Sequence, residues 1–376
     1  MQNGNILEKL CMVQMKSIFK SIPIEVLQRY ESELNVIKEA QIGGIYIFLA
    51  QIIKYVKQNQ LTAYVRGGGY SYIAYLLGIT EINPLKPHYY CAECREIEWT
   101  PQVTDGYDLN KKQCRKCGRM KIGNGHDIPL IDKKIIDAQY SIQVLQRDYE
   151  TMIQYIKNTF LSFKMEMEME MEMEMERKAN STWFVFPEAQ CPKIIIEMSR
   201  RCTIMENYYR TTGERWESIP MYNSEVYPLF QHMKSNECLR RGLKIGVPSS
   251  FSELMIVTGF GLTVGYDKYI LSSDNTRRKI MKNEFIICTE DLIKVLSFYC
   301  VLQKDIEKLT DSFKINSNLE KVRSILLKYE LPEYVIEFCL LPLGPFYIKA
   351  QIVENSIWSY REAWGKEIWN RRRYVY

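Results

Sequence analysis

Four cysteines in two Cys-x-x-Cys pairs constrain this chain more than any other feature of its sequence. Cys91 and Cys94 form the first pair, and Cys114 and Cys117 form the second after nineteen intervening residues. This spacing is typical of a structural zinc site, in which one tetrahedral ion takes four thiolates. Because four thiolates leave no coordination position for water, we expect the metal to hold the polypeptide together rather than to hydrolyse a substrate. Iron is the alternative, since four thiolates also suit that metal.

The segment that this metal would hold is the polar, glycine-containing insert of residues 88–126. His88 and His126 flank it and are either alternative ligands, donors to the ligands, or ordinary surface and capping histidines. The sequence leaves these three roles open.

Charge and cysteine usage restrict the class of protein. The 50 Lys and Arg residues against 45 Asp and Glu leave a net charge of only +5, so binding to nucleic acid would have to rest on local patches. An odd number of cysteines, 11, predicts reduced thiols rather than a disulfide framework. No secretory signal is evident, and the longest apolar stretch, residues 42–53, is shorter than the roughly 20 residues of a membrane-spanning helix. We therefore expect a cytoplasmic protein without a membrane segment.

The hydrophobic pattern divides the chain into four predicted parts. Residues 1–60 have apolar positions at three- and four-residue intervals and are expected to be a helical lead-in. Residues 61–150 contain a β-prone stretch, a glycine cluster and the insert. Residues 164–180 include six consecutive Met-Glu pairs, a low-complexity tract that we interpret as a linker and domain boundary. Residues 181–376 begin with short strands and continue mainly as helices.

Shorter segments carry their own predictions. Strands are expected at 61–65, 183–186 and 194–196, and a helical pattern at 135–163. Residues 70–77 are compatible with either a helix or a strand.

Several motifs occur in the order found in one known family. These motifs are Val65-Arg66-Gly67, Gly78-Ile79-Thr80-Glu81-Ile82-Asn83-Pro84-Leu85, Gly106-Tyr107-Asp108-Leu109 and Gly125-His126-Asp127-Ile128-Pro129. Together with the cysteine pairs, they resemble the palm segment of the α subunit of bacterial DNA polymerase III, in its PolC-type branch. After the Met-Glu tract, Thr212-Gly213, Val226–Phe230 and Ser250–Leu254 are similar to the passage from palm into fingers.

The resemblance implies an α+β fold. It would consist of a palm-like mixed sheet that bears the four-cysteine zinc insert, followed by a mainly helical, fingers-like region. It also implies a link to DNA replication, with DNA and replication proteins as partners and Mg²⁺ as the cofactor of nucleotidyl transfer. If palm strands are missing, an exposed sheet edge makes a homodimer plausible.

The carboxylates that such a polymerase needs are not found. Two Mg²⁺ ions require clustered acidic side chains, and the family supplies an Asp-x-Asp pair shortly after the segment equivalent to residues 126–129. Here that position contains only Asp132 and Asp137, five residues apart. The family's third Asp falls on Ile195, and the nearest acid is Glu197. These three acids are the weak catalytic candidates.

The family's phosphate-cradling turn is also altered. Arg66, Gly67 and Ser71 keep a phosphate donor, a close-approach backbone and a hydroxyl, whereas Tyr70 stands where the family has glycine. Further candidate phosphate contacts, which a solvated surface would explain equally well, are Arg200, Arg201, Arg371, Arg372 and Arg373.

The sequence therefore favours a catalytically inactive pseudo-polymerase that binds DNA. A protein-interaction module that competes for replication partners is the alternative. An active DNA-directed DNA polymerase, which would need Mg²⁺, is the third hypothesis.

Overall fold

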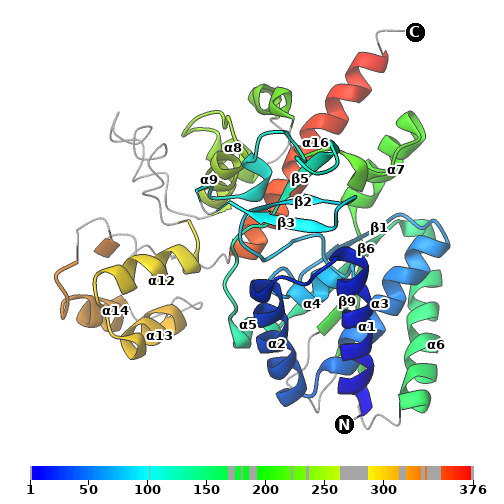
Figure 1. Ribbon diagram of the computed structural model, residues 1–376, viewed down its shortest axis with the longest axis horizontal. Helices are drawn as coiled ribbons and strands as arrows, with labels where there is room; N and C mark the ends of the chain where they lie inside the picture. The colour runs from blue at the N-terminus through cyan, green and yellow to red at the C-terminus, as the bar shows by residue number, and fades with distance from the viewer. Residues whose placement is uncertain are drawn as a thin grey trace. The chain divides into compact units, whose positions relative to one another are not determined.

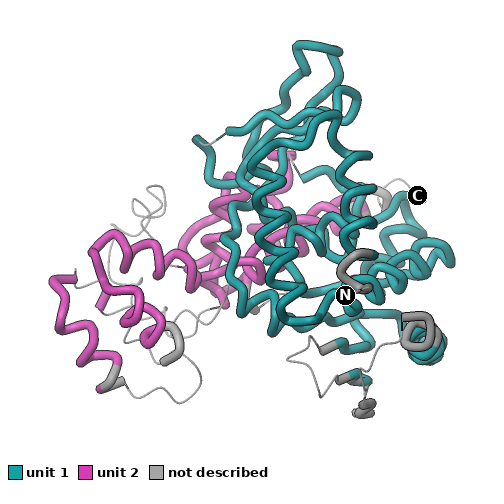
Figure 2. Tube along the Cα trace, turned by 60° about the horizontal axis from the view of Figure 1, so that its bottom comes forward, with its two compact units in different colours: residues 1–222 teal, residues 223–376 magenta. Residues whose placement is uncertain are grey.

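The computed structural model describes residues 2–100, 102–167, 174–178, 181–185, 193–221, 223–233, 237–262, 287–312, 319–331, 335–336 and 349–373. The chain divides into two compact units, residues 1–222 and 223–376 (Figure 2). The described part contains two small sheets and many helices, so the predicted α+β class is confirmed (Figure 1).

Three helices open the first unit, as the pattern of residues 1–60 predicts: α1 (Gln2–Ile18), α2 (Ile24–Glu39) and α3 (Gly43–Gln58). Pro23 precedes the first residue of α2, where the fixed φ of proline is compatible with a helix start. The left-handed φ of Gln41, 57°, separates α2 from α3. Most residues of α3 are buried, which makes this helix part of the core of the unit.

The larger sheet has five strands in the order β1 (Ala63–Arg66), β6 (Gln139–Val144), β9 (Lys193–Met198), β8 (Ser181–Val185) and β7 (Glu174–Lys178). Strands β6 and β9 pair in parallel, and the other neighbours are antiparallel. The strands predicted at 61–65, 183–186 and 194–196 correspond to β1, β8 and β9, although Phe186 lies outside the described residues.

Strand β6 corrects the helical pattern predicted for residues 135–163. Tyr140, Ile142 and Val144 are buried and lie two residues apart, which is the period of a strand. Because Tyr140 and Val144 are also four residues apart, the same apolar positions fit a helix, and the sequence pattern alone was ambiguous.

The two faces of this sheet differ in chemistry. One face is apolar, and helix α6 (Tyr149–Met167) contacts both β9 and α3. The rings of Phe48 and Phe160 meet edge to face at 5.7 Å between α3 and α6. The other face, which we call the polar face, carries on β1, β6 and β9 the side chains of Arg66, Gln139, Ser141, Gln143 and Glu197, together with Tyr64 and Ile195.

The remaining helices of the first unit are short or terminal: α4 (Tyr72–Leu76), α5 (Asp132–Ile136), α7 (Arg200–Thr212), and the 3₁₀ turns η1 (Gly106–Asp108), η2 (Gln146–Asp148) and η3 (Trp216–Ser218). Helix α4 resolves the ambiguity at residues 70–77. Its N-terminus is capped by Ser71, whose Oγ accepts a hydrogen bond of 2.8 Å from the N–H of Ala74.

The Met-Glu tract lies inside the first unit, whereas the two units divide after residue 222. Helix α6 extends to Met167, and β7 begins at Glu174. Residues 168–173 lie outside the described part. The two described parts of the predicted linker are therefore regular structure rather than loop. The first part continues α6, because Met and Glu favour helix. The second part is β7, where strict alternation matches the strand period and the strand pairs with β8.

The smaller sheet is formed by the cysteine-rich insert. Its order is β3 (Glu96–Trp99), β2 (His88–Cys91), β5 (Met120–Asn124) and β4 (Lys112–Gln113), and every neighbouring pair is antiparallel. These strands are short, so the sheet has little apolar area of its own.

The second unit is helical in its described part, with η4 (Ser224–His232), α8 (Glu237–Gly242), α9 (Phe251–Leu262), α12 (Thr289–Phe298), α13 (Gln303–Ser312), α14 (Leu319–Leu326) and α16 (Lys349–Arg373). The long helix α16 packs against α9 and η4. The Tyr360 hydroxyl hydrogen-bonds the N–H and the carbonyl oxygen of Asn223 at 2.8 and 2.9 Å, which ties α16 to the segment before η4.

Glu290 predicts a pH-dependent stability of the second unit. Its side chain accepts a 2.9 Å hydrogen bond from the N–H of Lys349 at the start of α16, and burial raises its pKa to about 7. Because the folded pKa exceeds the unfolded value, the contribution of this group is full below about pH 4.5 and is lost as the pH rises through 7. We expect the free energy of unfolding of the second unit, measured with urea, to decrease by about 3 kcal/mol at most between about pH 5 and 8.

The variant Glu290→Gln should remove most of this pH dependence. Glu307→Gln, which changes an exposed carboxylate of α13, is the matched control and should retain it. Identical pH profiles for the wild type and Glu290→Gln would contradict the prediction.

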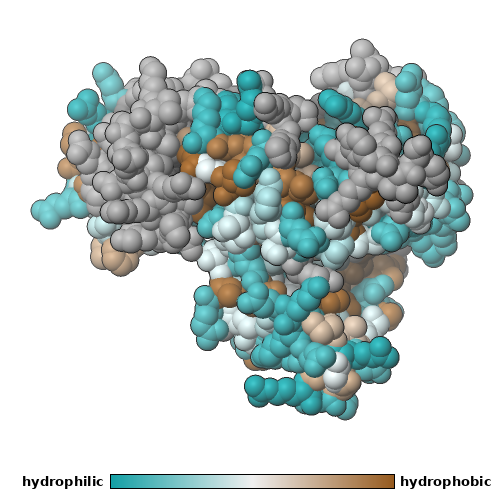
Figure 3. All heavy atoms as spheres, turned by 90° about the horizontal axis from the view of Figure 1, so that it is seen from above, coloured by the Kyte–Doolittle hydropathy of each residue, from teal (hydrophilic) through white to brown (hydrophobic). Residues whose placement is uncertain are grey.

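No single helix in the described ranges is long and apolar enough to cross a membrane. Helices α2 and α3 meet the length and composition criteria only as a pair, across a bend of 111°. On the face in Figure 3, hydrophobic residues form separate patches between hydrophilic ones.

Candidate functional site

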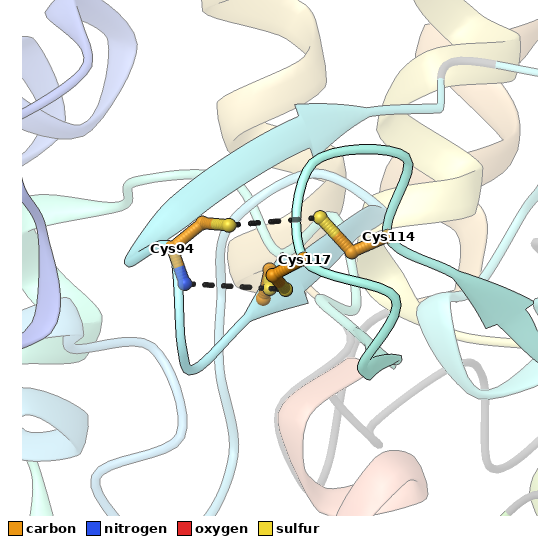
Figure 4. Close-up of side chains that lie close together, drawn as sticks. Cys94, Cys114 and Cys117 are labelled. Atoms are coloured by element: carbon orange, nitrogen blue, oxygen red, sulfur yellow. Dashed lines mark hydrogen bonds between the residues drawn. The ribbon is translucent and has the colours of Figure 1, made fainter.

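The four predicted cysteines converge in the insert. Their sulfur atoms all lie within 4.8 Å of one another. The Sγ atoms of Cys91 and Cys117 are 3.5 Å apart. Those of Cys94 and Cys114 are 3.7 Å apart, and Figure 4 shows this contact with Cys117 beside it. A tetrahedral ion with Zn–S bonds of about 2.3 Å separates its sulfur ligands by about 3.8 Å. The cluster therefore fits a four-thiolate metal centre, with zinc as the first candidate and iron as the second.

The local backbone explains why both Cys-x-x-Cys segments present their thiols to one point. In the first knuckle the N–H of Arg95 bonds the Cys91 carbonyl at 2.7 Å, and in the second the N–H of Gly118 bonds the Cys114 carbonyl at 2.9 Å. Both Arg95 and Gly118 adopt a left-handed conformation, with φ of 53° and 71°. The two knuckles thus share one geometry. The backbone N–H groups of Cys117 and Lys116 lower the pKa of the Cys114 thiol to about 6, whereas hydrogen bonds with the neighbouring thiols raise the pKa of Cys94 to about 12. A bound metal cation would favour the thiolate form of all four.

The two flanking histidines have partners outside the sulfur cluster. Nδ1 of His88 lies 2.6 Å from the carbonyl oxygen of Lys86, and burial lowers its pKa to about 4. Nδ1 of His126 lies 2.8 Å from the buried carboxylate of Asp105. Neither histidine belongs to the group of metal-binding atoms, so of the roles left open these contacts favour structural ones.

The insert is docked on the C-terminal end of α1. The Tyr90 hydroxyl donates to the carbonyl of Ile18 at 2.7 Å, and the Tyr90 ring meets that of Phe19 edge to face at 6.3 Å. The N–H of Lys20 bonds the carbonyl of Arg95 at 3.0 Å. A metal at the knuckles would therefore fix the position of the insert on its own unit.

The glycine turn is engaged by neighbouring protein groups. A Cβ at Gly67 would lie 2.1 Å from the carbonyl oxygen of Gln139, and one at Gly68 would lie 2.6 Å from the Tyr140 ring. These glycines therefore permit the close approach of the turn to β6. Arg66 is half-buried on the polar face, opposite Ser141.

A buried carboxylate, Glu33 of α2, occupies the start of α4. It accepts hydrogen bonds from the N–H groups of Tyr72 and Ile73 at 2.8 and 3.0 Å and from the Ser71 hydroxyl. The guanidinium of Arg29 lies 3.6 Å away. The donors that a bound phosphate would use at this helix start are thus already satisfied by the protein's own anion. Glu33 was not among the predicted site residues, because a single acid in an amphipathic helix is usually solvent-exposed, whereas here it is buried.

Gly67→Ala should destabilise the first unit by at least about 2 kcal/mol, because its φ of 102° disfavours alanine and the new methyl group would overlap the Gln139 carbonyl. Gly213→Ala is the control, since its φ is 74° but nothing lies within 4 Å of its Cβ position. We expect about 1 kcal/mol there. Urea unfolding of both variants measures the difference, and equal losses would show that the contact with β6 is unimportant.

Glu197 is the one acidic residue on strands β1, β6 and β9. Its Oε1 accepts hydrogen bonds from the Ser141 hydroxyl at 2.6 Å and from the Gln143 amide at 2.8 Å. In the parallel register Gln139 lies opposite Lys193, Ser141 opposite Ile195, and Gln143 opposite Glu197. This carboxylate therefore has neutral donors rather than a second carboxylate as its neighbours on these strands.

The other acidic candidates belong to a different element. Asp132 begins α5, Asp137 follows its last residue, and both side chains are exposed. The expected position of the Asp-x-Asp pair, residues 130–137, is thus a short helix, and the first strand after it is β6.

The candidate arginines are dispersed. Arg200 is exposed at the start of α7, and the Arg201 guanidinium lies 5.4 Å above the ring of Tyr64. The side chains of Arg371, Arg372 and Arg373, at the end of α16, lie outside the described part.

Comparison with known proteins identifies the family. Residues 5–213, which are 209 of the 376 residues, match the model of the bacterial DNA polymerase III alpha NTPase domain. The chain belongs to this family. The resemblance to its PolC-type branch is confirmed by the relatives described next.

Three relatives show the extent of the PolC-type likeness. The DNA polymerase III PolC-type of Mycoplasma pneumoniae is 40% identical over 120 residues, 31% of this chain and 8% of that protein. The Mycoplasma genitalium protein is 33% identical over 171 residues, 42% of this chain and 12% of its own length. The Thermotoga maritima protein is 38% identical over 111 residues, 29% of this chain and 8% of its length. The chain thus matches about a tenth of the length of these PolC-type polymerases.

Proposed function

We propose that this member of the DNA polymerase III α family binds DNA in connection with replication but does not copy it. The observation that carries the proposal is the polar face, where β1, β6 and β9 hold a single carboxylate, Glu197. Two-metal nucleotidyl transfer needs several carboxylates around ions about 4 Å apart. Gln139 and Ser141 of β6 lie opposite Lys193 and Ile195 of β9, and none of these four side chains is a carboxylate.

The hydrogen bonds of Glu197 support this reading. Ser141 and Gln143 both direct donors at its carboxylate. Such donors stabilise an isolated anion without a metal, because they supply the positive partial charge that a cation would otherwise provide. A single carboxylate is a weak Mg²⁺ site, since this ion is usually held by further oxygen ligands from protein and substrate.

The glycine turn supports the loss of catalysis independently. A triphosphate needs unoccupied N–H donors, and those of Tyr72 and Ile73 are directed at Glu33. Arg66 would then act on DNA rather than on an incoming nucleotide. The same proposal includes a palm-like role for the five-stranded sheet and a fingers-like role for the helices of the second unit.

Primer extension combined with a binding assay tests this proposal. Fluorescence anisotropy of the zinc-loaded chain on a labelled primed duplex should show binding that weakens steeply with salt. The same preparation should not extend the primer with Mg²⁺ or Mn²⁺. Template-dependent extension that is lost in Glu197→Gln, or in Asp132→Asn with Asp137→Asn, would establish an active polymerase instead. Absence of binding at low salt would favour the protein-interaction module.

Location and assembly are further parts of the proposal. A four-thiolate centre requires reduced cysteines, which supports a cytoplasmic protein. Strand β7 lies at one edge of the five-stranded sheet and pairs there only with β8 among the described strands, so a second copy could add at this edge. Light scattering of the full chain would show a dimer if it does.

A further inference from the structure

The second cysteine knuckle has a charge distribution unlike the rest of the insert. Residues 109–123 contain six Lys and Arg side chains and no Asp or Glu. In residues 88–108 acidic side chains outnumber basic ones, and Arg95 is the one Lys or Arg residue. The +5 net charge of the whole chain conceals this local separation.

Two glutamates of β3 neutralise part of the basic segment. Glu96 pairs with Lys116 at 2.6 Å, and Glu98 pairs with Lys112 and, at 2.5 Å, with Lys121. The two lysines lower the pKa of Glu98 to about 2, so this carboxylate is charged at neutral pH. Three lysines are thus engaged within the insert.

Three cations remain, Lys111 and two arginines that are directed to solvent. Arg115 and Arg119 are exposed, and neither forms an ion pair with any residue that the structure describes. Exposure is continuous from residue 115 to residue 120. A four-thiolate centre that holds Zn²⁺ carries a net charge of −2 and offsets part of the positive charge of residues 109–123, so the exposed arginines supply the cationic groups that a phosphate could reach.

Apolar side chains accompany the arginines. Met120 is 49% exposed and Ile122 is 53% exposed, two residues apart on one side of β5. Exposed residues of this kind beside arginine are a combination found in proteins that contact the DNA minor groove, where Met or Ile inserts at a base step and Arg binds the backbone or the narrow groove. We call Arg115, Arg119, Met120 and Ile122 the knuckle tip.

We propose that the knuckle tip is a nucleic-acid contact, with the two arginines on phosphates and the two apolar side chains against the bases or sugars. This inference rests on the proposed function, because it names the surface through which the chain would bind DNA. Arginine suits this role since its planar guanidinium pairs with phosphate oxygens in a bidentate manner. The two knuckles hold the tip rigidly through their N–H to carbonyl bonds, which reduces the entropy lost on binding.

The test is fluorescence anisotropy of the full, zinc-loaded chain on a labelled primed duplex, over roughly 50 to 200 mM salt. Arg115→Gln with Arg119→Gln should weaken binding about tenfold or more and reduce the slope of log Kd against log salt by about 1.8, or 0.9 for each lost phosphate contact. Lys54→Gln with Lys57→Gln removes the same charge from exposed positions of α3 and should leave the slope unchanged.

A second pair of substitutions separates the apolar contact from the charge. Met120→Ser with Ile122→Ser should weaken binding about tenfold without altering the salt slope, since no charge is removed. Zinc content and circular dichroism of each variant should match the wild type, because all four side chains are exposed.

The outcomes distinguish this inference from the proposed function. Unchanged affinity and slope in the arginine variant, with salt-dependent binding by the wild type, would overturn the inference and leave DNA binding intact. Equal losses in the arginine and lysine variants would also overturn it, because total charge rather than the tip would then govern binding. A wild-type chain that does not bind at low salt would overturn both proposals.

Discussion

Cys117→Ser is expected to abolish stable metal binding by the insert. The wild type should hold one equivalent of zinc per chain after dialysis, and the variant close to none. The variant keeps three thiolates and a hydroxyl, which is a poor zinc ligand. We expect the affinity to fall by more than the roughly 10- to 100-fold that results when a residue supporting a ligand is lost.

The consequence for folding should be large because the insert has little core of its own. Its strands are two to five residues long. Zinc contributes about 10–16 kcal/mol of apparent binding energy in small metal-dependent domains. Loss of the ion should therefore expose the amides of β2 and β5 to rapid hydrogen exchange and release the contact of Tyr90 with Phe19.

Cys300→Ser provides the control. Cys300, like Cys117, is an exposed free cysteine, but it lies in the second unit and outside the sulfur cluster. Its replacement should leave the zinc content and the exchange of the insert unchanged. A Cys117→Ser chain that retained one tightly bound zinc would contradict the four-thiolate centre.

Glu33→Ala is expected to destabilise the first unit by about 3–5 kcal/mol. The substitution would leave the Arg29 guanidinium only its hydrogen bonds to the carbonyl oxygens of Ile128 and Tyr70. It would also remove the buried acceptor for Ser71 and for two N–H groups of α4, which cost free energy when left unpaired.

Glu31→Ala on the same helix is the matched control, since Glu31 is exposed. It should change stability by no more than about 0.5 kcal/mol. Urea unfolding monitored in the first unit gives both values. A loss below about 1 kcal/mol for Glu33→Ala would mean that the glycine turn holds its conformation without this carboxylate.

The parts of the structure that could be predicted are those with local signals. The cysteine spacing predicted a cluster that the structure confirms, because the Cys-x-x-Cys geometry is set within four residues. The helices of residues 1–60 were predicted because their apolar residues recur at the helical period. Family membership followed from several motifs that occur in the order found in the family.

The parts that could not be predicted depend on contacts between distant segments. The roles of Gly67 and Ser71 depend on β6 and on Glu33, which lie far from them in the sequence. Whether Glu197 had a second carboxylate beside it depended on the register of β6 against β9, across more than 50 residues. The candidates Asp132 and Asp137 lie in and next to α5, and β6 begins only at Gln139. A hydrophobic period does not show where a short helix ends and a strand begins.

The pairing of β7 with β8 has a consequence for how the gene can vary. A repeated Met-Glu codon pair is prone to gain or lose units during copying, and each unit adds two residues. Two residues are also one full period of side-chain alternation in a strand. Gain or loss of one Met-Glu unit therefore changes the length of the tract by a whole period, so the alternation of Met and Glu stays in phase with the backbone pairing of β7 and β8.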